Sequence, residues 1–297
     1  MKHYRLLLAL IVFSLVFSAC GGKSATPAAT QATGSSNAMV MTVWGSQLDP
    51  EVYQARLDLF TMANPDIPVE LLYIPSDYSQ KVQTMMAGGQ SPCIIQVAED
   101  VHGYSGKGQI ISLDNYVSAA GIDLAKRYGG TGGLVQAYTW QGNLYAMPDR
   151  GGALVLYYNK DMFDNAGIAY PTKEWTWTEF LEAAQKLTVK NGDSVDVYGF
   201  AAGDWWPWWM SFIYMNGGAV LDANGKPVVN SPENIEAMQF YNDLVYKYHV
   251  APSPEDYANM GQSGPDPLFA QGKVAMSMTG FWAVNGLSKV QGLNWDI

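Results

Sequence analysis

The chain has 297 residues and is acidic, with 27 Asp and Glu against 17 Lys and Arg and a formal net charge of −10. This balance argues against nucleic-acid binding, which needs a basic surface to replace the counterions of the phosphates. The three histidines lie far apart and no Cys/His group has zinc spacing, so we expect no metal site and no cofactor.

Residues 1–19 have the features of a signal peptide. Lys2 and Arg5 precede an apolar run that ends at Phe17 and is too short to be read as a membrane span. Residues 17–20, FSAC, resemble the lipobox of bacterial lipoproteins, which implies a lipid attached to Cys20. The alternative is an ordinary signal peptide followed by an incidental cysteine.

Residues 20–38 are rich in Gly, Ser, Thr, Ala and Gln, a composition that predicts a flexible tether. If Cys20 carries a lipid, Cys93 has no partner, and a disulfide is excluded. About 260 residues remain to fold, enough for two modest lobes or one large domain.

The first half of the folded part alternates between short apolar runs and segments with helical spacing. This alternation predicts parallel α/β units. The expected strands are 39–44, 69–74 and 93–97, and the expected helices are 50–63 and 78–87.

The second half repeats the alternation, with Thr176 and Glu179 forming a T-x-x-E capping box and Ser231-Pro232 opening another helix. The chain stops at Ile297, just after residues that look like the start of one more strand, so we expect a truncated sequence. The expected elements are strands 153–158 and 274–278 and helices 161–166, 176–190 and one from 232.

Four stretches together resemble the extracellular solute-binding lipoproteins of carbohydrate ABC transporters, the group that includes maltose-binding protein. Their order and spacing agree over essentially the whole mature chain. In one departure, Cys93 stands where the family usually has Asp, and relatives also continue for about another hundred residues. The stretches are 78–92, LYYNKDMFDNAGI (156–168) with WTWTEFLEAAQKLT (175–188), 216–238, and LFAQGKVAMSMTGFW (268–282).

The resemblance implies a two-lobed, periplasmic-binding-protein-like α/β fold (type II) whose C-terminal part is missing. Lobe I would comprise residues 39–150 and 268–297, and an incomplete lobe II residues 151–267. A sugar or oligosaccharide bound between the lobes would favour their closed form, which docks on ABC permease subunits. The implied protein is a monomer, periplasmic or lipid-anchored through Cys20 on the outer face of the cytoplasmic membrane.

The stretch GDWWPWWM (203–210) places four tryptophans within five positions. Side chains at nearly consecutive helical positions point in different directions, so they cannot all face a core. Because aromatic rings pack well against the C–H faces of a sugar, we expect Trp205 and Trp206 to bind ligand, and Trp208 or Trp209 to be core. Trp282 ends the fourth stretch, where the family places a sugar-stacking tryptophan. Trp44 is a weaker candidate, and Trp175 and Trp177 are expected to be structural.

Polar ligand contacts are expected from loops that follow strands of the first lobe and from the crossover between lobes. Arg can donate to two hydroxyls at once, carboxylates accept from hydroxyls, and amides can donate or accept. The resemblance places an acidic ligand contact at Asp100. The candidates are Gln47, Glu99, Asp100, Asp149 and Arg150.

Two alternatives remain open at this point. The same fold can bind glycerol phosphate, a polyamine or a peptide, and acidity is compatible with a cation. A secreted glycosidase would also combine aromatics with carboxylates, but no pair of carboxylates is singled out and no catalytic motif is present. We therefore expect a binding protein and not an enzyme.

Overall fold

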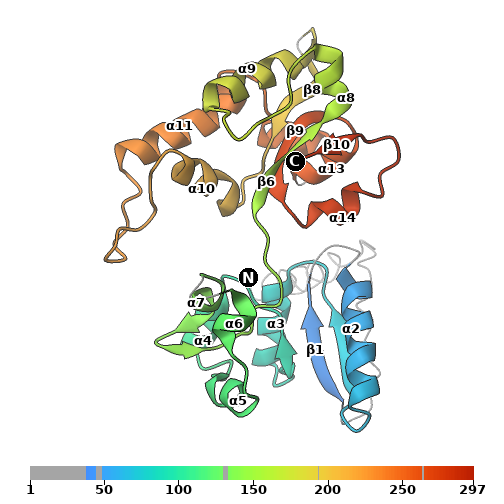
Figure 1. The fold of residues 1–297 in the computed structure, drawn as a ribbon, viewed down its shortest axis with the longest axis vertical. Helices are drawn as coiled ribbons and strands as arrows, with labels where there is room; N and C mark the ends of the chain where they lie inside the picture. The colour runs from blue at the N-terminus through green and yellow to red at the C-terminus, as the bar shows by residue number, and fades with distance from the viewer. Residues whose placement is uncertain (1–37, 45–48, 130–132, 193, 263) are drawn as a thin grey trace, which may run out of the picture. The chain divides into compact units, whose positions relative to one another are not determined.

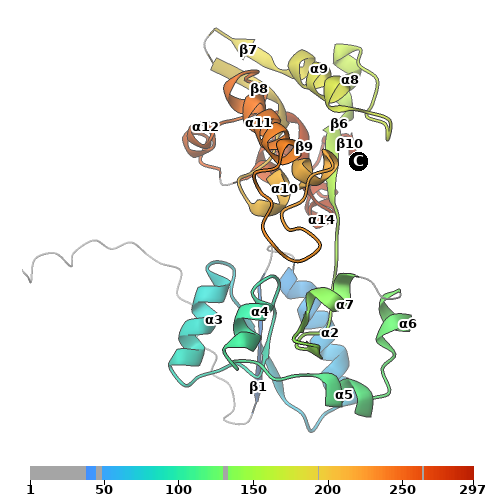
Figure 2. The same cartoon turned by 90° about the vertical axis from the view of Figure 1, so that its left-hand side faces the viewer.

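The computed structural model describes residues 38–44, 49–129, 133–192, 194–262 and 264–297. The expected signal peptide, Cys20 and almost all of the expected tether lie outside these residues. The chain divides into two compact units, Met1–Met147 and Pro148–Ile297, which are described separately (Figures 1 and 2).

The first unit is built on a parallel sheet, as the alternation of strands and helices predicts. Its order is β2-β1-β3, and β1 pairs with both neighbours in parallel. Parallel neighbours need a crossover, which helices α2 and α3 supply. The elements are β1 (Met39–Val43), α2 (Asp49–Ala63), β2 (Val69–Tyr73), α3 (Tyr78–Ala87) and β3 (Ile94–Ile95).

Short helices and a hairpin complete the first unit. They are α4 (Val101–Gly106), α5 (Asp114–Ala119), α6 (Leu124–Tyr128), α7 (Gly133–Ala137), β4 (Thr139–Trp140) and β5 (Asn143–Leu144). The buried cluster beside the sheet consists of Ile74, Tyr78, Val82 and Tyr104, and Trp44 packs against it.

The second unit contains a mixed sheet of order β10-β6-β9-β8-β7. The β8–β9 pair is parallel, and the other three pairs are antiparallel, so the expected parallel pattern does not extend to this unit. The strands are β6 (Leu154–Asn159), β7 (Val189–Asn191), β8 (Ser194–Ala201), β9 (Val274–Gly280) and β10 (Trp295–Asp296).

Helices cover both faces of this sheet. One face packs against a large core that includes residues of α8 (Lys160–Ala166), α9 (Trp177–Leu187), α10 (Trp206–Met215) and α11 (Pro232–Tyr246). The other packs against a smaller core with α13 (Pro265–Ala270) and α14 (Ala283–Leu287), and α12 (Pro254–Asn259) adds Tyr257 to it. Strand β9 is buried along its whole length.

The assignment of residues 268–297 to the first lobe is wrong. Strand β9 lies between β6 and β8, and β10 pairs with β6, so these residues complete the sheet of the second unit. The apolar face of α13 packs into the core of the same unit, which fixes the segment there. The boundary between the two units follows Met147, just before residues 149–153, where the first crossing was expected.

Helix α9 also differs from the expected helix 176–190. It ends at Leu187, and residues 189–191 form β7. Thr188 and Val189 are β-branched and favour a strand, and the pairing of β7 with β8 decides between the two states. The capping box of Thr176 and Glu179 at the other end is confirmed.

In the described part of the chain, each helix is too short or too polar to cross a lipid bilayer.

Candidate functional site

Three solvent-exposed tryptophans lie together in the second unit. Trp205, Trp206 and Trp282, hereafter the aromatic cluster, are 40%, 42% and 52% exposed. The ring centroid of Trp205 is 5.8 Å from that of Trp206 and 6.0 Å from that of Trp282. Two segments far apart in the sequence, the start of α10 and the turn between β9 and α14, therefore bring their tryptophans to one place.

The start of α10 sets the directions of its tryptophans. Trp205 is the N-cap residue in an extended conformation, and Pro207 occupies the first turn. An N–H in the first turn has no partner within the helix, so proline costs no hydrogen bond there. Trp208 and Trp209 pack against the large core, which confirms that the four side chains divide between core and surface.

Two glycines make room for two of these rings. A β-carbon on Gly280 would lie 1.9 Å from Cζ3 of Trp282, and one on Gly203 would lie 2.2 Å from Cζ3 of Trp208. Both rings therefore rest against backbone that only glycine leaves open. Neither glycine was predicted from the sequence to belong to the site.

Trp175 and Trp177 have the structural roles expected of them. The ring of Trp177 stacks on Phe240 at 4.5 Å and 3°, and that of Trp175 stacks on Phe163 at 6.3 Å and 29°. Both pack against the large core.

Polar groups not predicted as site residues lie beside the aromatic cluster. Asp266 is half-buried near Thr279 and Trp282, and burial raises the pKa of its carboxyl more than these neighbouring side chains lower it. Tyr241 donates a hydrogen bond to the carbonyl of Gly203 at 2.5 Å. In the sequence, Asp266 only marks the start of a short helix, and that gives no sign of a buried carboxyl.

The described candidates of the first unit, Trp44, Glu99 and Asp100, follow the carboxyl ends of β1 and β3. The backbone N–H of Trp44 donates to Oε1 of Gln96 at 2.8 Å, and its ring meets Tyr78 edge-on at 5.0 Å. Gln96, which was not among the predicted site residues, thus holds the end of β1 to that of β3. Such an amide contact gives no distinct sequence signal.

Asp100 is engaged in local structure. Its Oδ2 accepts a hydrogen bond from Ser79 at 2.6 Å, and its Oδ1 accepts one from the backbone N–H of Ala98 at 3.2 Å. Glu99 beside it is exposed. Asp149 and Arg150 are exposed on the segment before β6. Gln47 lies outside the described residues.

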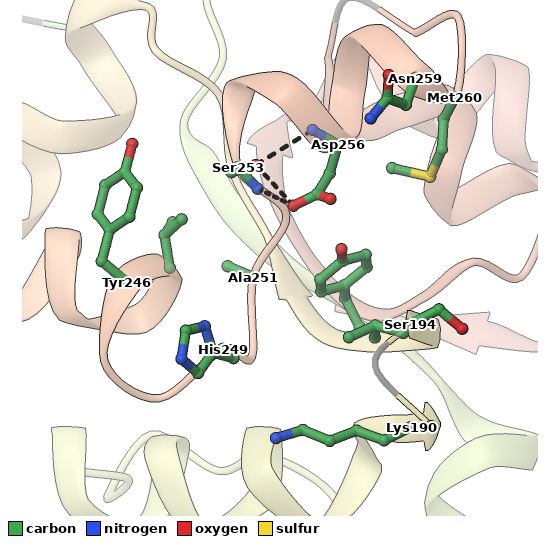
Figure 3. A pocket seen from close by; sticks show the side chains of 13 residues that line it. Lys190, Ser194, Tyr246, His249, Ala251, Ser253, Asp256, Asn259 and Met260 are labelled. Atoms are coloured by element: carbon green, nitrogen blue, oxygen red, sulfur yellow. Dashed lines mark hydrogen bonds between the residues drawn. The ribbon is translucent and has the colours of Figure 1, made fainter.

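A groove of about 760 Å³ lies at the start of β8 (Figure 3). Trp205 and Trp206 follow the other end of this strand. Its lining includes Lys190, Tyr246 and His249. One wall carries the Ser253–Asp256 capping box, in which the carboxylate accepts two bonds of 2.7 Å from Ser253. The groove contains no predicted site residue.

Over the described ranges, no three His, Cys, Asp or Glu side chains come together as a metal site would require. Cys93 is an exposed free thiol.

Comparison with known proteins matches the family of bacterial extracellular solute-binding proteins over residues 40–294. The arabinooligosaccharide-binding protein of Halalkalibacterium halodurans is 26% identical over 195 residues, which are 63% of this chain and 41% of the relative. The chain thus spans about two fifths of that curated relative.

Solved structures agree with this match. An ABC substrate-binding protein from Listeria monocytogenes in complex with cycloalternan aligns with a TM-score of 0.77 and 30% identity, covering 87% of this chain and 64% of that one. UgpB from Mycobacterium tuberculosis, in complex with glycerophosphocholine, has the same fold at a TM-score of 0.72 and 20% identity, covering 88% and 64%. The family match covers most of the chain, so the chain belongs to the bacterial extracellular solute-binding proteins, which are not enzymes.

Proposed function

We propose that the chain captures an oligosaccharide for an ABC importer, and that the aromatic cluster binds it. The observation that carries the proposal is the contact between Trp205 and Trp282, two rings that are each at least 40% exposed. Large apolar rings that gather on a surface mark an interaction site.

The chemistry of a neutral sugar fits such a surface. A pyranose presents C–H groups on its faces, and these pack against planar aromatic rings, while its hydroxyls form a polar rim. The rings of Trp205 and Trp282 are inclined by 57° to each other, so one flat sugar ring cannot lie on both. Two successive sugar residues, each on its own ring, satisfy this geometry.

The relatives support the same substrate class. One of them is an arabinooligosaccharide-binding protein, and the Listeria protein holds cycloalternan. Trp44, Glu99, Asp149 and Arg150 are proposed as further contacts. Asp100 is a weaker candidate, because both of its oxygens already accept internal hydrogen bonds.

We further propose that the protein delivers its ligand to permease subunits while tethered by a lipid on Cys20. The sequence FSAC at residues 17–20 and the polar segment that follows it support the anchor. A lipid-anchored binding protein remains close to its permease.

A second candidate is a cationic or phosphorylated solute. Tryptophan faces attract cations, and several inclined rings can surround an ammonium group. The structural relative with glycerophosphocholine shows that the fold can hold such a molecule. The exposed sides of the aromatic cluster do not distinguish a choline group from a sugar.

The experiment is isothermal titration calorimetry of the mature protein with arabino-oligosaccharides, maltodextrins, cycloalternan, the matching monosaccharides, glycerophosphocholine and spermidine. The proposal expects saturable binding of one oligosaccharide, weaker binding of its monosaccharide, and no product after prolonged incubation. Binding of glycerophosphocholine or spermidine alone would establish the second candidate instead.

Variants connect the binding to the aromatic cluster. Trp282→Ala and Trp205→Ala should each weaken binding at least about tenfold, which corresponds to about 1.4 kcal/mol. Tyr116→Ala is the matched control, since Tyr116 is 63% exposed and lies on α5 of the first unit. Unchanged affinity in both tryptophan variants would contradict the assignment.

A further inference from the structure

Helix α13 packs on β9 over a buried polar seam. Tyr157, on β6, contacts Phe269 of α13 with ring centroids 6.1 Å apart and pairs with Ser277 in the sheet. Paired residues share a face of the sheet, so Ser277 and, two positions on, Thr279 also lie beneath α13. These two hydroxyl residues are 0% and 1% exposed.

Three oxygens in this seam have no hydrogen-bond partner among the described residues. They are Oδ1 of Asp266, Oγ of Ser277 and Oγ1 of Thr279. Buried polar atoms are nearly always paired, so unpaired ones in a native fold call for a reason. Two of them lie on β9 itself, Thr279 directly before Gly280 and Ser277 three residues before it, and Gly280 is the residue on whose backbone the ring of Trp282 rests.

Asp266 is the charged member of the seam. Its carboxyl is close enough to Thr279 and Trp282 for both side chains to favour its ionised form, although burial has the larger effect and raises its pKa. Burial raises the pKa of the Tyr157 hydroxyl to about 12, and the Asp266 carboxyl adds to this rise. The same hydroxyl donates to the carbonyl of Gly280 at 2.9 Å. The carboxyl therefore lies beside the backbone on which the ring of Trp282 rests.

The ring of Trp282 is fixed on one side and open on the other. Gly280 lies against its six-membered ring, with three ring carbons 1.9 to 2.2 Å from where a β-carbon would be. The residue is nevertheless 52% exposed. The glycine prevents the ring from moving inward, but it does not stop the ring from turning away into solvent.

We propose that Asp266 is a positioning residue for Trp282, its carboxyl holding the indole N–H so that the ring lies on Gly280 with its open face toward the ligand. This inference rests on the proposed function, because the direction of the open face matters only if that face binds a solute. A charged acceptor suits the role, since hydrogen bonds to a carboxylate are stronger than neutral ones.

The test follows the indole N–H resonance of Trp282 in ¹⁵N-labelled protein, assigned by its loss in Trp282→Phe. Asp266→Ala should shift or broaden this resonance and weaken oligosaccharide binding about tenfold. Asp266→Asn keeps an acceptor oxygen and should restore most of both signals. Asp196→Ala, which removes an exposed carboxylate from β8, should change neither.

A double-mutant comparison separates positioning from general damage. In a Trp282→Ala background, Asp266→Ala should weaken binding no further, because its effect passes through the missing ring. If Asp266→Ala does not fold, Asp266→Leu, which fills the space with apolar atoms, replaces it in every measurement.

An unchanged Trp282 resonance in the Asp266 variants would overturn the proposal, as would an equal loss of affinity with and without Trp282. If the native protein binds none of the carbohydrates, the proposed function fails. The resonance would then still show whether Asp266 holds the ring.

Discussion

The indole ring of Trp282 lies against the backbone of Gly280, so closely that a β-carbon there would overlap three ring carbons at 1.9 to 2.2 Å. The two residues are separated in the chain by Phe281 alone. The end of β9 thus forms a seat for the ring, and the seat exists because position 280 has no side chain. The ring also contacts Trp205, 6.0 Å away between centroids, which joins the end of β9 to the start of α10.

Gly280→Ala should reduce oligosaccharide affinity at least about tenfold, because Trp282 must leave its seat to make room for the methyl group. The affinity is measured by calorimetry and the fold by circular dichroism. Gly286→Ala is the matched control, since a β-carbon at that glycine of α14 meets nothing within 4 Å. Equal affinity in the two variants would show that the seat is unimportant.

Trp177→Ala should lower the free energy of unfolding by about 3 kcal/mol and leave the affinity unchanged. Its ring stacks on Phe240 at 4.5 Å and also contacts Phe212 at 5.8 Å, so its loss opens a cavity in the large core. Trp206→Ala should instead weaken oligosaccharide binding and leave the free energy of unfolding unchanged, because Trp206 is exposed in the aromatic cluster. Urea unfolding and calorimetry on both variants measure the contrast, and a shared loss of affinity would contradict it.

Asp266→Asn should raise the melting temperature at neutral pH. Burial raises the pKa of Asp266 in the folded state, so folding favours the protonated carboxyl and is opposed by the ionised one. Above the raised pKa the native carboxylate destabilises the fold, and this penalty disappears as pH falls towards the ordinary aspartate pKa of about 3.9. Asparagine carries no such penalty at any pH.

The difference in melting temperature between Asp266→Asn and the native protein should therefore shrink as the pH is lowered. Differential scanning fluorimetry from neutral to acidic pH measures it, with Asp196→Asn as the exposed control. A constant difference over the whole range would show that the carboxyl does not titrate with folding.

Local sequence signals predicted much of the fold because their causes are local. The capping box at Thr176 and Glu179 fixes the start of α9 through bonds among adjacent residues, and helix α3 has the predicted bounds 78–87. The end of α9 depends instead on pairing between β7 and β8, which residues 188–191 do not encode alone. Likewise, the apolar run of β9 shows a buried strand but not which sheet it joins.

The candidate site likewise contains some residues that could be predicted from the sequence and others that could not. Exposed tryptophans were predictable because so many consecutive rings cannot all be buried. Asp266 and Gly280 were not, since their significance arises from contacts with Thr279 and Trp282 that need the folded α13 and β9. Gln96 is similar: its amide matters because β3 lies beside β1, where it accepts from the N–H of Trp44.

Tyr78→Phe should destabilise the first unit by about 1–3 kcal/mol. The Tyr78 hydroxyl accepts a bond from the backbone N–H of Gln96 at 2.8 Å and lies 2.8 Å from Oγ1 of Thr42. Burial raises its pKa to about 12, so it stays neutral and can donate at physiological pH. Removing the Tyr78 hydroxyl leaves the Gln96 N–H and the Thr42 hydroxyl without this hydrogen-bond partner. The ring that contacts Trp44 remains.

The measurement is urea unfolding of the native protein, Tyr78→Phe and Tyr116→Phe, the last removing an exposed hydroxyl from α5. The Tyr116 variant should match the native protein. Thr42→Val should reproduce part of the Tyr78 loss, and the double variant should lose less than the sum, because both remove the same bond. Additive losses would mean that the two hydroxyls act independently, and that the hydrogen bond between Thr42 and Tyr78 does not stabilise the link between β1 and α3.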